Sequence, residues 1–237
     1  ISDVLGISSY LRKEVNFDLV RLDNPYKNTG VAIGYYPDKQ MAYVTFNLLD
    51  VTTDIRPQPD NSFTLGYSFL QQGFTSRYSF TPQAYVSSLG RIYSIPDNES
   101  VWKHETGLYA NYYGVQYESS ISLFGTSEGM YNSTWDTLSY TGRLTDLNGN
   151  DIYDESFTSI RVYNEHQDTG VVSLVNFTNH RHRDRRWNVG LPRVQGSRAR
   201  ISNPWAIMEL SYLGDGTKRI IVDSANATYR LYPSSYI

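Results

Sequence analysis

Short runs of alternating apolar and polar residues, separated by turn-forming residues, recur along most of the chain. The first complete example is Gly30–Phe46, in which apolar-rich runs at Val31–Tyr36 and Met41–Phe46 flank Pro37–Gln40. Proline fixes φ at a value suited to a turn and supplies no backbone donor for a strand ladder. Period-two alternation on both sides of such a turn predicts a β-hairpin.

The same pattern returns at Phe63–Leu70 and Phe74–Phe80, which are joined by Gln71-Gln72. The intervening residues 54–61 contain two prolines and cannot continue a central strand, so they are expected to form a loop. The four runs together predict one four-stranded antiparallel unit of the size of a propeller blade. One sheet cannot bury both of its faces, so we expect its outer face or edge to be covered by segments from outside the chain.

Beyond this unit, short β-like runs at roughly ten-residue spacing predict an all-β fold of antiparallel sheets with little helix. The first unit would be followed by a β-sandwich or by further blade-like sheets, and the absence of an internal repeat argues against a propeller closed within this chain. We predict an N-terminal segment at 1–29, with weak helix-like spacing over 1–24, and β units at 30–110 and 111–237. The later strands are expected at Gly90–Ile95, Val101–Glu105, Gln116–Phe124, Asp136–Thr141, Ser159–Asn164, Val171–Phe177, Ala206–Leu213, Arg219–Asp223 and Ala227–Tyr232.

Composition supports a folded β protein that relies on packing. The 237 residues include 21 Tyr, 9 Phe and 4 Trp, which supply large areas for burial, and they include no Cys, so neither a disulfide nor a thiolate metal site can form. No apolar window is long enough to span a membrane. The chain starts at Ile1 rather than Met, so we expect it to be a processed product or part of a longer protein.

The most unusual composition lies between His180 and Arg200, where seven arginines accompany one aspartate. This segment has a formal charge of +6 and the remaining 216 residues carry −9. An arginine-rich loop with Trp187 inside it suits contacts with carboxylates of another subunit, or with phosphates and a stacked base, and a plain solvated loop is the third interpretation. The candidate contact residues are Arg181, Arg183, Arg185, Arg186, Trp187, Arg193, Arg198 and Arg200.

Signatures of catalysis and of cofactor binding are not found in the sequence. The pair His180 and His182 would point to one face of a strand, but no third metal ligand can be identified near it. The sequence contains no nucleophile elbow, zinc-protease motif, P-loop or dinucleotide-binding glycine motif. We therefore predict no enzyme activity, no metal and no cofactor.

The middle of the chain carries, in this order, Ser79-Phe80-Thr81-Pro82, Tyr85, Leu89, Ile92-Tyr93-Ser94, Val101-Trp102-Lys103-His104, Tyr112-Tyr113-Gly114, Tyr117-Glu118-Ser119-Ser120-Ile121 and Trp135-Asp136-Thr137-Leu138. This series resembles the tail-closing muzzle protein of crAss-like bacteriophages. The opening hairpin is also similar, with Gly34-Tyr35-Tyr36-Pro37-Asp38 followed by Met41–Phe46. The resemblance extends over residues 28–232.

The resemblance implies a C-terminal portion of a non-enzymatic virion protein at the distal end of a phage tail. In that case copies of the chain would form a ring, with six as the expected number, around the DNA exit channel and act in genome ejection. The partners would be other copies, the N-terminal portion of the same precursor, neighbouring tail proteins and, transiently, DNA. The arginine-rich segment would lie at a subunit junction.

Two alternatives remain open from the residues alone. A carbohydrate-binding β protein, such as a tail adhesin or a bacterial surface glycan binder, would use Trp102, Trp135, Trp187 or Trp205 as sugar platforms. A nucleic-acid-binding protein would use the arginine-rich segment and would bind DNA in a salt-sensitive manner.

Overall fold

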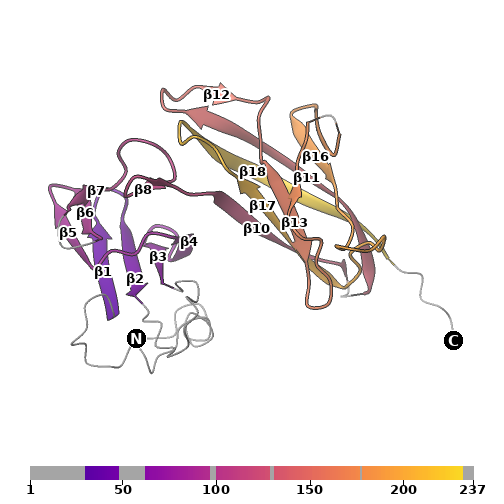
Figure 1. Cartoon of the computed structure of the whole chain (residues 1–237), viewed down its shortest axis with the longest axis horizontal. Coiled ribbons are helices and arrows are strands. Elements are labelled where there is room, and N and C mark those ends of the chain that lie inside the picture. Colours follow the sequence, from indigo (N-terminus) through magenta and orange to yellow (C-terminus); the bar gives the residue numbers. More distant parts are fainter. Residues whose placement is uncertain (1–29, 48–61, 97–99, 129–130, 177, 232–237) are drawn as a thin grey trace. The chain divides into compact units, whose positions relative to one another are not determined.

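The computed structural model describes residues 30–47, 62–96, 100–128, 131–176 and 178–231 (Figure 1). In these residues the structure is nearly all β, with antiparallel sheets, which confirms the predicted fold class. The chain divides into two compact units, Ile1–Gly107 and Leu108–Ile237. The helix-like segment 1–24 and the proline-containing segment 54–61 lie outside the described residues.

The first unit contains the predicted four-stranded antiparallel sheet. Its strands follow one another in sequence order, and each neighbouring pair is antiparallel. Pro37–Gln40 form the first turn, which Gln40 closes by donating its backbone N–H to the carbonyl of Pro37 at 3.1 Å. The strands are β1 (Gly30–Tyr36), β2 (Met41–Asn47), β3 (Phe63–Ser68) and β4 (Gly73–Tyr78).

A second, three-stranded sheet packs against β1. Its strands are β5 (Ala84–Ser88), β6 (Arg91–Ile95) and β7 (Trp102–Lys103). The close approach requires Gly34, because a Cβ atom there would lie 2.5 Å from the ring of Tyr85. The hydroxyl of Tyr85 reaches Thr45 Oγ1 at 2.6 Å, and burial raises the pKa of this tyrosine to about 12.

The other face of the first sheet is less covered. The alternate residues Val31, Ile33 and Tyr35 of β1 are 45%, 66% and 45% exposed. Together with Phe69 and Phe74 they leave apolar side chains on the surface of the described part of this unit. Coverage of this face by segments from outside the chain stays a prediction.

The second unit consists mainly of two sheets that share one hydrophobic core, the arrangement of a β-sandwich (Figure 1). One sheet has the order β10-β17-β13-β14. These strands are β10 (Ser119–Thr126), β17 (Trp205–Tyr212), β13 (Ser159–Tyr163) and β14 (Val172–Ser173). A short hairpin of β8 (Asn111–Tyr112) and β9 (Val115–Gln116) precedes it.

The other sheet is built around β11 (Ser133–Asp146), a strand of 14 residues. One side of β11 pairs along its length with β18 (Lys218–Leu231). The opposite side pairs at one end with β12 (Asp151–Ile152) and at the other with β16 (Arg186–Gly190), which in turn pairs with β15 (His180–Arg183). Strands β18 and β15 therefore form opposite edges of this sheet.

Two parts of this sheet differ from the sequence-based prediction. The runs Arg219–Asp223 and Ala227–Tyr232 are not two strands, because the described residues of both belong to the single strand β18. Asp223 is the extra residue at a bulge between them, where the register shifts from Thr141 to Gly142, and the polar residues after it made the run look interrupted. The arginine-rich segment, expected to be a loop, forms strands β15 and β16 in its first half.

Candidate functional site

The arginine-rich segment begins with a tight hairpin, here called the arginine hairpin (residues 180–190). His180 lies opposite Val189, His182 opposite Trp187, and Arg183 opposite Arg186. The two turn residues Asp184 and Arg185 both have positive φ, 53° and 61°, as a two-residue type I′ turn requires. Asparagine and glycine are the usual residues in such a turn, so an arginine there strains the backbone, and the turn is not evident from the sequence.

The inner face of the arginine hairpin is part of the sandwich core. The indole of Trp187 is 1% exposed and packs between two imidazoles, with ring centroids 4.3 Å from His180 and 4.4 Å from His182. His180 Nε2 and the hydroxyl of Tyr140 share a hydrogen bond of 2.7 Å, and that hydroxyl also reaches Ser156 Oγ at 2.8 Å. This stack fixes the hairpin to the central strand β11.

Burial controls the charge of this stack. Desolvation, with a further contribution from nearby His182, lowers the pKa of His180 to about 4. Burial also raises the pKa of Tyr140 above its ordinary value. Both groups are therefore neutral at physiological pH, which suits a position beneath a cluster of guanidinium groups.

The outer face of the arginine hairpin is strongly basic. Alternation along the two strands places Arg181, Arg183 and Arg186 on the face opposite to Trp187, and Arg185 occupies the turn. All four are exposed. The single acidic neighbour, Asp184, lies 3.5 Å from Arg183, but both side chains are more than 85% exposed, so this pair does little to offset the positive charge.

The remaining arginines of the segment have different surroundings. Arg193 donates to the backbone carbonyl of Arg198 at 3.0 Å, and both side chains are exposed. Arg200 instead forms a salt bridge with Asp136. The same carboxylate forms a salt bridge with Arg230, with 2.5 Å between Asp136 Oδ2 and Arg230 Nε. Hydrogen bonding to Arg230 is the main reason why the pKa of Asp136 is lowered. Arg200 is thus paired with a carboxylate of β11, whereas the four hairpin arginines face solvent.

The structure changes the expected role of several aromatic candidates. Trp187 is a core residue, so it cannot stack on a base or a sugar without leaving the interior. Trp135 is likewise 2% exposed and donates from Nε1 to the carbonyl of Asn203 at 3.0 Å, so it is not a surface platform. Trp102 and Trp205 retain exposed ring surface, and Trp205 packs beside Phe124 with ring centroids 5.9 Å apart.

The histidine pair also has a packing role. His180 and His182 do point to one face of a strand, as predicted, and both rings contact Trp187. Alternation of His and Arg before the turn, and of Trp, Asn and Val after it, was the sequence signal for this hairpin. The hairpin was not predicted from this signal, because its turn residues are Asp184 and Arg185 instead of a pair that contains glycine.

Four exposed guanidinium groups on a rigid hairpin can form bidentate hydrogen bonds with carboxylates or phosphates. Because the hairpin is attached through its buried face, such contacts would require little further ordering of the backbone. The arrangement is that of a binding surface for an anionic partner.

Comparison of the sequence with known protein families indicates what kind of protein has this surface. Residues 107–194 match the family model of the Crassvirus muzzle protein C-terminal domain. This part of the chain is therefore similar to the C-terminal domain of the Crassvirus muzzle protein. Within residues 107–194 the match confirms the resemblance found in the sequence, and a muzzle protein domain implies a component of a phage virion tail.

The match to the muzzle domain includes the whole arginine hairpin and ends before β17 and β18. A structural family is consistent with the expectation that the chain is not an enzyme. No helix in the described part of the chain is long and apolar enough to cross a membrane. Comparison with the curated proteins gave no match.

Proposed function

We propose that the chain is a subunit of a homo-oligomeric ring that forms or closes the distal end of the DNA exit channel of the tail. The four exposed arginines of the hairpin carry this proposal. They lie within the region that matches the muzzle domain, on a hairpin anchored by Trp187. Arginine is enriched at protein interfaces, where its fork binds carboxylates of the neighbouring subunit.

The charge distribution supports a role at a DNA channel. The arginine-rich segment is positive, whereas the rest of the chain has a formal charge of −9. Once the arginines are paired at a subunit junction, the remaining surface repels duplex DNA and lets it pass without binding. The homo-oligomer would meet neighbouring tail proteins and the remainder of its own precursor through its other surfaces.

Negative-stain electron microscopy of the purified chain, with and without the remaining portion of the muzzle protein, tests this function. We expect closed rings of uniform diameter in at least one of the two samples. Monomers in both samples at high protein concentration would contradict the proposal.

DNA contact is a second candidate for the same arginines, because all four are exposed and, among the described residues, only Arg183 forms an ion pair, with the exposed Asp184. It predicts salt-sensitive retention on DNA-cellulose that is lost when Arg183, Arg185 and Arg186 are changed to Glu. Each phosphate contact contributes about 0.9 to the slope of log affinity against log salt concentration. Retention that does not change with salt would exclude DNA as the partner.

A further inference from the structure

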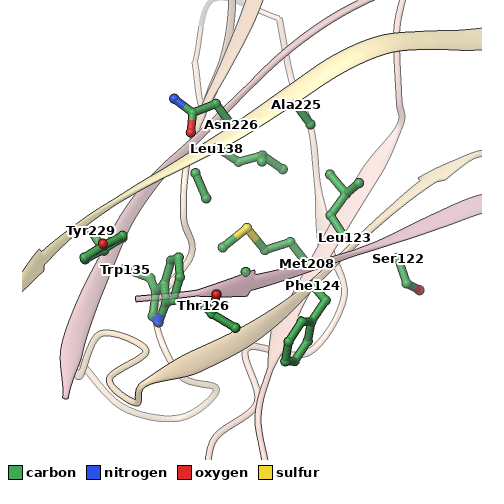
Figure 2. Close-up of a pocket in the computed structure, with 12 residues that line it drawn as sticks. Ser122, Leu123, Phe124, Thr126, Trp135, Leu138, Met208, Ala225, Asn226 and Tyr229 are labelled. Atoms are coloured by element: carbon green, nitrogen blue, oxygen red, sulfur yellow. The ribbon is translucent and has the colours of Figure 1, made fainter. Parts of the chain in front are cut away.

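The β-sandwich of the second unit has one open side. Strands β10 and β18 are the last strands of their respective sheets, and a pocket of about 430 Å³ lies between them. Figure 2 shows this pocket, here called the edge pocket, with side chains from β10, β11, β17 and β18 around it. Its volume lies within the range of pockets that bind ligands or peptide side chains.

The lining of the edge pocket defines what can bind there. None of its 12 residues carries a charge. Trp135, Leu138 and Met208 are buried at its base, whereas Phe124 at the rim is 65% exposed. Each flanking strand also offers one edge that pairs with no strand among the described residues. An uncharged peptide in an extended conformation fits such a site, because its backbone can pair with the edge while its side chains fill the pocket.

Two bulges flank the part of β18 that lines the edge pocket. Asp223 is the extra residue at one end of the pocket segment of β18, and Asp136 is the extra residue on β11 at the other end. Asp223 Oδ2 forms a salt bridge with Arg143 Nη1 at 2.9 Å, and Asp136 forms salt bridges with Arg200 and Arg230. Bulges increase the local twist of a strand pair, and these two flank the part of β18 that lines the edge pocket.

The chain itself contains a segment of matching chemistry. The described chain leaves β18 at Leu231, two residues after Tyr229 at the pocket wall, and continues as Tyr-Pro-Ser-Ser-Tyr-Ile over residues 232–237. These six residues have no charged side chain, whereas the longer segments 1–29 and 48–61 contain several. At about 3.3 Å per residue, six extended residues reach about 20 Å, which is enough to run beside residues 225–229.

Pro233 disfavours a direct return of this segment along its own β18. A two-residue hairpin turn after Leu231 would need positive φ at Pro233 in type I′, which the proline ring forbids, or at the bulky Tyr232 in type II′, where glycine is the usual residue. A longer turn would place Pro233 at the second central position of a type I turn, where proline is also disfavoured. We propose that the edge pocket binds residues 232–237 of a second copy of the chain, and that two copies exchange these segments reciprocally. This pairing does not depend on the arginine hairpin or on a ring.

Disulfide trapping tests the exchange, because the chain has no cysteine of its own. One variant, Asn226→Cys, carries a cysteine at the edge pocket, and the other, Tyr236→Cys, carries one in the segment 232–237. The two single variants are mixed and oxidised. We expect a disulfide-linked dimer joined at positions 226 and 236, identified by mass spectrometry of the linked peptides. Its yield should exceed by about tenfold that of a control mixture of Arg185→Cys with Tyr236→Cys, because binding raises the effective concentration of the two thiols.

A second pair of variants checks that the pocket itself is responsible. Ala227→Arg places a charge in the pocket and should abolish the link, whereas Thr228→Arg, exposed on the same strand, should leave it. Failure of the mixture to form more dimer than the control overturns the proposal. An internal link in the double variant Asn226→Cys/Tyr236→Cys, without a dimer from the mixture, would assign the pocket to the same chain and also overturn it.

Discussion

The two edges of the sheet around β11 differ in the chemistry that they present. The β15 edge carries three exposed arginines on its outer face and the turn, whereas the pocket segment of the β18 edge, residues 224–228, has no charged side chain. Charged side chains on an edge strand oppose pairing with another strand, and an uncharged edge permits it. On this account one sheet binds an anionic partner at its charged edge and an extended peptide at its uncharged edge. The charge on the first edge keeps the peptide from pairing there.

The edges also differ in how they are supported. The arginine hairpin depends on one buried aromatic stack of Trp187 with His180 and His182. The β18 edge instead pairs with β11 over nearly its whole length and is shaped by bulges at Asp136 and Asp223. Loss of a single side chain should therefore affect the first edge much more than the second.

Truncation of the buried indole should have the largest effect. Trp187→Ala removes a side chain that is 1% exposed, and we expect the free energy of unfolding to fall by about 3–5 kcal/mol. Urea denaturation followed by circular dichroism measures the change. Arg181→Ala, on the opposite face of the same hairpin, is the control and should stay within about 0.5 kcal/mol of the unchanged chain. A loss below about 1 kcal/mol for Trp187→Ala would show that the stack does not support this edge.

Acid should weaken the arginine edge through His180. The pKa of this imidazole is about 4 in the folded state and 6.5 in the unfolded state, so between these values the unfolded state binds more protons. Stability is therefore lost as the pH falls through this window, by about 2 kcal/mol between about pH 8 and about pH 5. Asp136 has a lowered pKa and titrates below the window.

The matched variant for this pH dependence is His180→Gln, which cannot be protonated. Its free energy of unfolding should lack the component that the unchanged chain loses between about pH 8 and about pH 5. Equal pH dependence for the two proteins would contradict a buried, neutral His180.

A small change on the open side of the sandwich should have a smaller effect. A methyl group on Gly125 of β10 would lie 3.0 Å from two ring carbons of Trp135, which is held by its hydrogen bond to Asn203. Gly125→Ala should therefore push β10 outward and cost about 1 kcal/mol in the free energy of unfolding. Ser122→Ala, on the exposed face of β10, should have no measurable effect on the same denaturation curve. A stabilising Gly125→Ala would mean that β10 can move freely at this edge.

Much of the fold was predictable because alternation and turn chemistry agree with each other. Pro37–Gln40 marks a turn between two apolar runs, and the four-stranded sheet followed from it. The single strand β18 was not predicted, because bulging at Asp223 and the polar residues after it interrupt the alternation on which the prediction depended. Pairing with β11 holds these residues in a strand despite their composition.

The arginines of the candidate site were predicted from charge alone, but their grouping was not. Only the register of β15 with β16 separates the exposed Arg181, Arg183 and Arg186 from the buried Trp187, and only the fold brings Arg200 to Asp136. The edge pocket could not be predicted, because Met208 of β17 and Tyr229 of β18 lie far along the chain from the lining residues of β10 and β11.

Sedimentation velocity tests most directly whether the arginine hairpin forms the subunit junction. The double variant Arg185→Gln/Arg186→Gln is compared with Arg91→Gln/Lys103→Gln, which removes the same charge from exposed positions of the first unit. We predict that the unchanged chain and the control self-associate equally, and that the hairpin variant associates about 30-fold more weakly, as expected for loss of about 2 kcal/mol at an interface. Equal self-association of all three proteins would contradict the account.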